Sequence, residues 1–451
     1  MNRFLASSSI IVLMALSAPA SAGDFENALA SAWQTNPQME AARASLRANA
    51  EGVSQALSGW LPSVSLSGSA GVSRTDAKPG ERDGSESRSL GISLTQSIYS
   101  GGGTVAAVAS ARAQLRAEEA SLATTEQTVL LDAITAYVDA IKTAAILKAT
   151  ANNEDVLKRQ LDATKDRFEV GELTRTDVSQ AEASLASITA SRIEAEGNLN
   201  SAIATYESVI GSRPINLPES DRDIPLPPLP MGLPSSLSET IDAALAASPA
   251  ILASVATEAA SEYTIDTIKA AMLPNISLAA SIGKSWTPSS SSTKDVEAAS
   301  ITAYLSVPLY AGGYNLSLLR AARENVQKSK FDLDNTRRTT RKTAIAAWEG
   351  WTSSHAAINA YKAAVDASDL ALEGVRSENE VGTRTILDIL NAEQTSLDSH
   401  VNLINARRNE LISAYTLLEA VGRLTARDMG LQVTLFNAEA EAAEIESHWG
   451  L

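Results

Sequence analysis

The sequence predicts a mixed fold in which long antiparallel α-helices are continuous with membrane-spanning β-strands. Three observations carry this prediction. Pairs of segments alternate apolar and small polar residues, a long run without proline follows each pair, and the whole arrangement occurs twice along the chain. A period of two indicates strands, whereas an apolar residue at every third or fourth position indicates helices. An internal repeat on this scale has to enter any account of the fold.

Residues 1–22 have the pattern of a secretory signal peptide. Arg3 gives a short basic start, residues 10–16 form an apolar core, and Ala20-Ser21-Ala22 fits cleavage after small residues. The apolar core is too short to span a bilayer, which argues against a membrane anchor. We therefore expect an exported chain that begins at Gly23. No later run reaches about eighteen consecutive apolar residues, so a membrane-bound chain would be there as strands.

The rest of the chain divides into two equivalent repeats, residues 23–211 and 237–424. Length alone, 451 residues, would suggest about three domains, but the duplication argues for two halves of one architecture. Several prolines stiffen residues 212–236, which we expect to form an extended linker. Residues 425–451 are expected to form a peripheral acidic tail.

In the sequence of the first repeat, helices are expected both before and after the strands. Apolar residues recur at helical spacing from 24 to 60, with an interruption at Asn36-Pro37. The proline-free run 104–168 predicts one helix of about 100 Å, which Val170-Gly171 ends. Residues 174–210 then form a shorter antiparallel partner.

The second repeat copies these helices. Ser248-Pro249 echoes the interruption, a long helix is expected over 314–380, and Val381-Gly382 ends it. A shorter partner follows over 385–421. The apolar seam of the long helix is copied in register, with Val108, Leu115 and Leu122 in the first repeat and Leu319, Val326 and Leu333 in the second.

Each repeat contains one expected β-hairpin, over 62–98 and over 274–309. Polar runs at 74–88 and 284–298 are expected to be the connections between the strands of each hairpin. The borders recur as well: Leu61-Pro62 and Leu273-Pro274 precede the hairpins, and Tyr99-Ser100-Gly101-Gly102 and Tyr310-Ala311-Gly312-Gly313 follow them.

The strands predict an assembly in a membrane. Each is about ten residues long, the length of a tilted transmembrane strand, with one apolar face and one face of Ser, Thr, Gly and Ala. Four strands cannot close a barrel, and open edges are not tolerated in hydrocarbon. Copies of the chain must therefore complete the wall, as a dimer or a trimer. A soluble sandwich with serine-rich strands is the alternative, and the polar connections would face outside the cell in the membrane version.

Composition excludes several classes of function. The net charge is −16, which argues against nucleic-acid binding because that needs a basic face. The chain has no cysteine, so it has neither a disulfide framework nor a lipid anchor on cysteine. His355, His400 and His448 are scattered without metal-ligand spacing and are expected at the surface. We expect no metal and no cofactor.

A turn motif, Val-Gly-x-x-Thr-x-x-Asp, occurs at 170–177 and again at 381–388. Its glycine suits the left-handed residue after a helix, and its threonine and aspartate, three residues apart, suit a capping box. Capping explains most of the motif. Both turns are also expected at the end of the helices farthest from the hairpins, where carboxylates in a symmetric assembly would form a ring at the mouth of a tube.

With these features the chain resembles the TolC-like outer-membrane efflux and secretion channels. The resemblance rests on the duplication, the Leu-Pro and Tyr-x-Gly-Gly borders, and Val-Gly-Thr-Arg-Thr-Ile-Leu-Asp-Ile-Leu-Asn-Ala at 381–392. It implies a homotrimer in the Gram-negative outer membrane, with a β-barrel of four strands from each protomer and a coiled-coil α-helical barrel that crosses the periplasm. It further implies contact with outer-membrane lipid, a periplasmic adaptor (membrane fusion) protein and an inner-membrane transporter.

The resemblance also implies a gate at the periplasmic end. Thr176 and Asp177 fall on the family's latch positions in the first turn, and Arg384 falls on the opposing basic position in the second. The family's latch tyrosine falls on Asn379, so that hydrogen bond is in question.

Two acidic rings constrict the pore in the family, and this chain matches one of them. Asp388 falls on the first acidic position, whereas the second falls on Asn391. The resemblance therefore implies one ring of carboxylates at the mouth and a weaker preference for cations.

Two other classes of function compete with a channel. A soluble periplasmic adaptor or a secreted helical structural protein would share the alanine-rich, cysteine-free composition, but would be extracted without detergent. An enzyme would need a nucleophile–base pair, a metal cluster or a phosphate loop. Gly101-Gly102-Gly103 lies between a strand and a helix but lacks the Lys-Ser/Thr of a phosphate loop, so no catalytic residue is expected.

Overall fold

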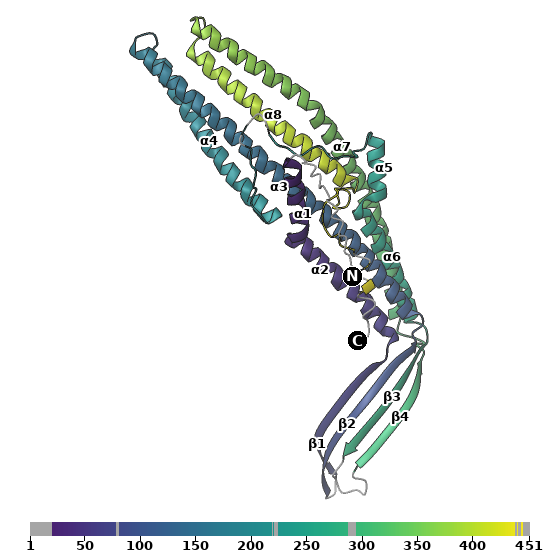
Figure 1. Cartoon of the computed structure of the whole chain (residues 1–451). Helices are drawn as coiled ribbons and strands as arrows, with labels where there is room; N and C mark the ends of the chain where they lie inside the picture. Colours follow the sequence, from purple (N-terminus) through teal and green to yellow (C-terminus); the bar gives the residue numbers. More distant parts are fainter. Residues whose placement is uncertain are drawn as a thin grey trace, which may run out of the picture. The chain divides into compact units, whose positions relative to one another are not determined.

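A computed structural model describes residues 20–77, 81–218, 220, 224–286, 295–437, 440 and 443–444 (Figure 1). Most of the expected signal peptide, His448 and much of the acidic tail lie outside these residues. The chain separates into two compact units, each described here by itself. The turn unit comprises Met1–Met39, Glu126–Thr240 and Ala344–Thr434, and the sheet unit comprises Glu40–Thr125, Ile241–Thr343 and Leu435–Leu451.

The sheet unit contains one antiparallel sheet with the strand order β1-β2-β3-β4. Figure 1 shows the four strands side by side. The two hairpins join through β2 and β3, so β1 and β4 are the edges. The strand bounds are β1 Ser63–Ala77, β2 Glu81–Tyr99, β3 Asn275–Trp286 and β4 Asp295–Ser306.

The polar runs at 74–88 and 284–298 are not simple connections, and this part of the sequence prediction is wrong. Arg74 pairs with Gly84 and Val72 with Glu86 in the first hairpin, and Lys284 pairs with Glu297 in the second. Ladder hydrogen bonds come from the backbone, so strands continue through polar side chains wherever alternation and pairing persist. Residues 78–80 and 287–294 lie outside the described part of the chain. At the other end, β4 stops at Ser306 before Pro308, because proline cannot donate to the ladder.

Helices of the sheet unit pack side by side at the end of the sheet where β1 and β3 begin and β2 and β4 end. α3 lies between α2 and α6: Ser45 Oγ donates to Glu118 Oε1 over 2.5 Å, and Ser110 Oγ donates to the Ala260 carbonyl over 3.2 Å. α7 packs on α6, where the hydroxyls of Ser329 and Ser261 are 3.1 Å apart. The bounds are α2 Pro37–Leu57, η1 Ser58–Trp60, α3 Gly103–Glu169, α5 Leu237–Ala247, α6 Pro249–Ala270 and α7 Tyr314–Glu380, of which α3 and α7 continue into the turn unit.

The turn unit is helical and contains α1 Ala20–Thr35, α4 Arg175–Ile210 and α8 Ile386–Ala420, with the second parts of α3 and α7. A bidentate ion pair joins α8 to α3, with Arg408 Nε and Nη2 at 2.9 and 3.0 Å from the Asp139 carboxylate oxygens. Glu126 Oε1 accepts from the Trp33 indole and from the Ala426 backbone. These contacts join α1, α8 and the segment that follows α8 to α3, although they are far apart in sequence.

One helical stretch of the described chain, Leu237–Ala270, is long and apolar enough to cross a membrane by length and composition, with a mean hydropathy of 1.4. It is the pair α5 and α6, which the kink at Ser248-Pro249 separates. Core helices of soluble proteins pass the same test, so the stretch is only weak support for a membrane-spanning helix. It contains no run of consecutive apolar residues of the length considered above.

Candidate functional site

The first turn connects α3 to α4 and is built by capping. Gly171 has φ +78°, which a side chain would strain, and it lets the chain leave α3. Thr174 is the N-cap of α4, and its hydroxyl accepts from the Asp177 backbone N–H. The Asp177 carboxylate accepts in return from the Thr174 N–H over 2.8 Å and from its hydroxyl over 2.7 Å. The expected capping box is confirmed at this turn.

The second turn connects α7 to α8 with nearly the same geometry. Gly382 has φ +79°, and Thr385 is the N-cap. The Asp388 carboxylate accepts from the Thr385 N–H over 2.9 Å and from its hydroxyl over 2.8 Å. The second expected capping box is confirmed as well.

Both aspartates at these turns are held in the ionised form. Hydrogen bonds from the Thr174 hydroxyl and N–H hold the pKa of Asp177 below its usual value, and the nearby Arg167 acts in the same direction. The Thr385 N–H and hydroxyl lower the pKa of Asp388, with a further contribution from the charge of Arg384. Each turn therefore presents a negative charge near the first turn of a helix, where the helix dipole also favours an anion.

Arg384 is fixed inside the second turn. Its Nε donates to Glu378 Oε2 over 2.8 Å, and its carbonyl accepts from Asn379 Nδ2 over 2.7 Å. The structure thus brings Arg384, Asn379 and Asp388 together in one turn. Thr176 is exposed on the first turn of α4, and Asn391 is exposed on the second turn of α8. Among the described residues of one chain, Asp177 and Arg384 each have a partner in their own turn, and the latch between them stays a prediction.

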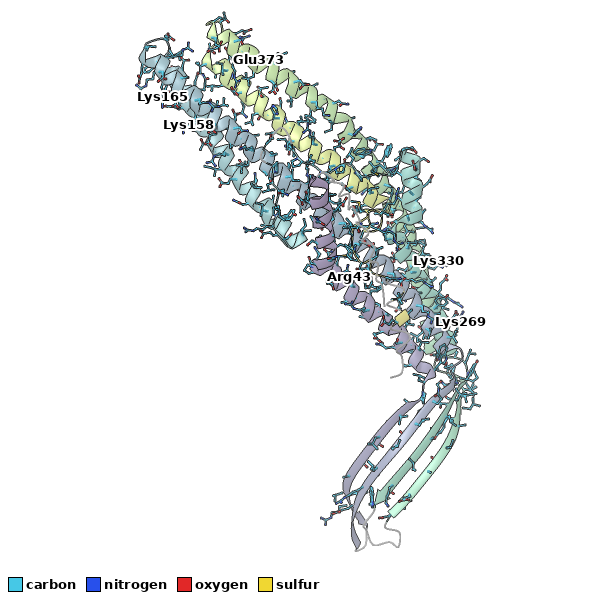
Figure 2. All side chains as sticks on the ribbon, viewed as in Figure 1. Arg43, Lys158, Lys165, Lys269, Lys330 and Glu373 are labelled. Atoms are coloured by element: carbon cyan, nitrogen blue, oxygen red, sulfur yellow. The ribbon has the colours of Figure 1, made fainter. Side chains whose placement is uncertain are left out.

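A shared apolar core holds the two turns. Figure 2 places Lys165 near the end of α3 and Glu373 near the end of α7, the two helices that lead into the turns. Behind the turns, buried side chains of α3, α4 and α8 form one cluster, with partly buried residues of the first turn and of α7 around it. The buried members are Ala149, Leu157, Ile188, Ile386, Ile389, Leu390 and Leu397.

The polar contacts beside this core were not predicted from the sequence. Glu393 is buried on α8 and accepts from Arg376 of α7, with Nε at 3.1 Å. Both line a cavity of about 510 Å³ between α3, α7 and α8. Glu393 occupies a position of the apolar seam of α8, and a charged residue at such a position was the available signal. The partner could not be read from the chain, because it lies on another helix.

His400 lines the same cavity, and its expected surface position is wrong. Only 17 % of its side chain is exposed, and Nε2 lies 3.1 Å from both carboxylate oxygens of Asp369. Ser396 Oγ donates to the same carboxylate over 2.6 Å. His355 is exposed, as expected, beside Glu410. No group of three or more metal-ligating side chains occurs in the described part of the chain.

The chain is similar to known proteins over most of its length. The model of the outer membrane efflux protein family matches residues 28–212 and 240–423. Outer membrane efflux protein BepC of Brucella suis biovar 1 is 32% identical over 422 residues, which cover 94% of this chain and 90% of BepC. Outer membrane protein TolC of Vibrio cholerae is 28% identical, over 88% of this chain and 90% of TolC.

A secretion protein and a solved channel are similar too. Alkaline protease secretion protein AprF of Pseudomonas aeruginosa is 28% identical, over 69% of this chain and 64% of AprF. The crystal structure of the Campylobacter jejuni CmeC outer membrane channel superimposes with a TM-score of 0.76 at 18% identity, over 94% of this chain and 89% of CmeC. At that identity the superposition supports the fold.

Proposed function

The chain belongs to the outer membrane efflux protein family, and from that premise we propose that it is the gated exit duct of a tripartite efflux pump or a type I secretion system. It is an outer-membrane protein, and the members of its family are channels rather than enzymes.

The observation that carries the proposal is the two-faced sheet. Large apolar side chains share one face and stand in solvent in the single chain, with Leu66 70 %, Ile282 61 % and Ile301 77 % exposed. The register places Leu66 opposite Ile92 and Ile92 opposite Ile282, so this face is continuous across strands. An apolar face of this extent on a sheet has to be covered, and lipid is the cover that an outer-membrane strand requires.

The opposite face is lined with hydroxyls. Ser65, Ser93, Ser281 and Ser300 stand in one row across all four strands. The Oγ atoms of Ser65 and Ser93 are 2.7 Å apart, and those of Ser281 and Ser300 are 3.0 Å apart. Such a face suits water, and we assign it to the bore of the channel.

The free edges at β1 and β4 support a shared barrel. Backbone groups at an open edge have no partner in hydrocarbon, so edges of other copies must pair with them. Three copies give twelve strands, and cyclic symmetry closes the wall. We propose this homotrimer, with the long helices α3 and α7 continuing from the sheet as the wall of a periplasmic tunnel.

The gate is proposed at the two capped turns. Asp388, with Asn391 beside it on α8, forms a single ring of carboxylates at the inner mouth. Asp177 and Thr176 of one copy face Arg384 of the next as a latch, and Asn379 supports the Arg384 backbone. Exposed ion pairs contribute little each, so such a latch holds the pore shut and still yields to a docking partner. A periplasmic adaptor and an inner-membrane transporter are the partners that this gate would serve.

Recordings in planar bilayers test the duct and its ring. The purified protein should conduct with a preference for cations, and Asp388→Asn should reduce that preference while the asparagine oxygen preserves the cap. Asp398→Asn, a neutralisation of an exposed carboxylate on the same helix, is the matched control. An unaltered reversal potential in Asp388→Asn would remove Asp388 from the pore, and a complete lack of conductance would contradict the duct.

The latch has its own test in the same recordings. Asp177→Ala combined with Arg384→Ala should raise the resting conductance, because the contact between copies is lost. Thr176→Ala should raise it less. Equal conductance in the double variant and the unmodified protein would contradict the latch and leave the duct in place.

A further inference from the structure

α7 and α8 form a hairpin whose apolar seam repeats every seven residues. Buried aliphatic residues of this seam are Ile358, Val365 and Leu372 on α7, and Leu390, Leu397 and Ile404 on α8. A spacing of seven keeps these side chains on one side of each helix. Because all of them are aliphatic, the seam by itself does not distinguish one alignment of the two helices from an alignment shifted by one repeat.

Two pairs of polar side chains join the helices in the observed alignment. His400 Nε2 of α8 lies 3.1 Å from both carboxylate oxygens of Asp369 on α7. Arg376 Nε of α7 donates to the buried Glu393 of α8 over 3.1 Å. On each helix the two polar residues are seven positions apart, so the two pairs stand one repeat apart along the hairpin.

The acid and the base change sides between these pairs, which we call the crossed pairs. Asp369 puts the acid of the first pair on α7, whereas Glu393 puts the acid of the second pair on α8. A shift of one repeat, about 10 Å along α8, would bring these two carboxylates against each other. It would also separate Arg376 and His400 from their acids. Like charges in a partly buried contact are unfavourable, so the crossed pairs oppose an alignment that the apolar seam accepts.

The alignment of the two helices decides which residues form the second turn. Leu372 and Leu397 line the same cavity in the observed alignment, and after the shift Leu372 would lie against Leu390 instead. The tip of a hairpin lies midway between its paired residues, so it would move three or four residues toward α7. Thr385 would then lie inside α8 rather than at its N-cap, and Asp388 would leave the turn.

The first hairpin, α3 with α4, lacks crossed pairs. Figure 2 shows Lys158 and Lys165 on α3, at the positions that correspond to Asp369 and Arg376 when the two turn motifs are matched. Lys165 Nζ lies 3.4 Å from Glu182 Oε1 of α4. The same shift would bring Lys158 to Glu182, which is an attraction. The charges of the first hairpin therefore do not oppose a shift.

We propose that the crossed pairs set the register of the α7–α8 hairpin and so hold Asp388 in the second turn. Their members are positioning residues, because they act on the turn through the alignment of the two helices. Polar residues within an apolar helical seam are known to specify register in this way. The register stands on contacts within one chain, and only its meaning for the gate rests on the proposed function.

Engineered cysteine pairs report the alignment, because the chain has no cysteine of its own. Leu372→Cys with Leu397→Cys is the native pair, which lies level in the observed alignment. Val365→Cys with Leu397→Cys is the shifted pair, which lies level only after the shift. Oxidation, digestion and mass spectrometry of the linked peptides measure the yield of each disulfide. With the crossed pairs unchanged, the native pair should link and the shifted pair should not.

Two changes of charge should allow the shifted pair to link. Arg376→Glu with Glu393→Arg keeps a salt bridge in the observed alignment but gives Asp369 a base in the shifted one. Arg376→Leu with Glu393→Leu removes both charges and buries no arginine, so it keeps a well-packed layer. In each variant the yield of the shifted disulfide relative to the native one should rise about tenfold or more. Lys165→Glu with Glu182→Lys, the exchange in the first hairpin, is the matched control and should leave both yields unchanged.

The proposal is overturned if both charge variants form only the native disulfide, since the turn and the core would then suffice to set the register. A shifted disulfide that forms equally well with the crossed pairs unchanged, or a native pair that fails to link there, overturns it too. A protein that conducts in planar bilayers while both variants keep only the native disulfide leaves the duct standing. A protein that shows the expected disulfides without conducting contradicts the duct and leaves the register role in place.

Discussion

The two turns share one local structure but differ in what lies behind them. Their capping hydrogen bonds agree within 0.1 Å, at 2.8 and 2.9 Å from the threonine N–H to the carboxylate. α8 nevertheless begins with Ile386, Ile389 and Leu390 buried, each at most 6 % exposed. α4 begins with exposed residues, and Val178, at the position equivalent to Ile389, is only half-buried.

This difference separates a local source of structural order at the two turns from a tertiary one. The cap is made by residues three apart, so each turn forms it from its own sequence. The anchoring of α8 depends on α3 and α4, which are distant in the chain. Because the two caps are alike and the two helices are packed differently, the contributions of the caps and of the packing to stability can be compared.

The largest loss of stability is expected when a buried side chain at the start of α8 is truncated. Ile389→Ala should lower the free energy of unfolding by about 2–5 kcal/mol, because it removes a buried aliphatic group and leaves a cavity. Val178→Ala should cost markedly less, since that side chain is only half-buried. Thermal unfolding of both variants in detergent, followed by circular dichroism, measures the difference. Equal losses would mean that the two helices are anchored alike and would break the comparison.

A smaller loss of stability, equal at the two turns, is expected when either capping threonine is replaced. Thr174→Ala and Thr385→Ala should each cost about 1 kcal/mol, the usual contribution of a side chain that caps a helix. Ser179→Ala, which removes an exposed hydroxyl of α4 outside the proposed latch, serves as the control and should change little. The same unfolding experiment applies. If one cap costs several times as much as the other, then the capping contribution is not local.

The smallest effect on stability is expected from protonation of the two capping aspartates at low pH. The folded-state pKa values of Asp177 and Asp388 are lowered. Their contribution to stability is therefore present above the unfolded value of about 3.9 and is lost as the pH falls through the folded values. Asp177→Asn and Asp388→Asn should each flatten the fall of the unfolding temperature below about pH 4. A slope that neither substitution changes would show that the acid sensitivity comes from other carboxylates.

Sequence reasoning predicted the features that depend on near neighbours. The helices at 104–168 and 314–380 correspond to α3 Gly103–Glu169 and α7 Tyr314–Glu380. Glycine in the left-handed region and a threonine three residues before an aspartate are short-range signals, so both caps were predictable.

Where the sequence prediction was wrong or incomplete, the cause in each case is a contact with residues that are distant in the chain. Arg74 and Glu86 look like loop residues in the chain, yet both belong to strands because the facing strand pairs with their backbones. His400 is held by Asp369, and Glu393 by Arg376, each across two packed helices. Helical spacing assigns a residue to one side of its own helix, but the residue that it meets is set by how the helices pack.

The mass of the detergent-extracted particle tests the central claim most directly, because four strands with two open edges need copies to complete a wall in lipid. Native mass spectrometry of protein taken from outer membranes should find three chains in one particle. Protein that stays in aqueous buffer as a single chain, without detergent, would contradict the account of a shared channel.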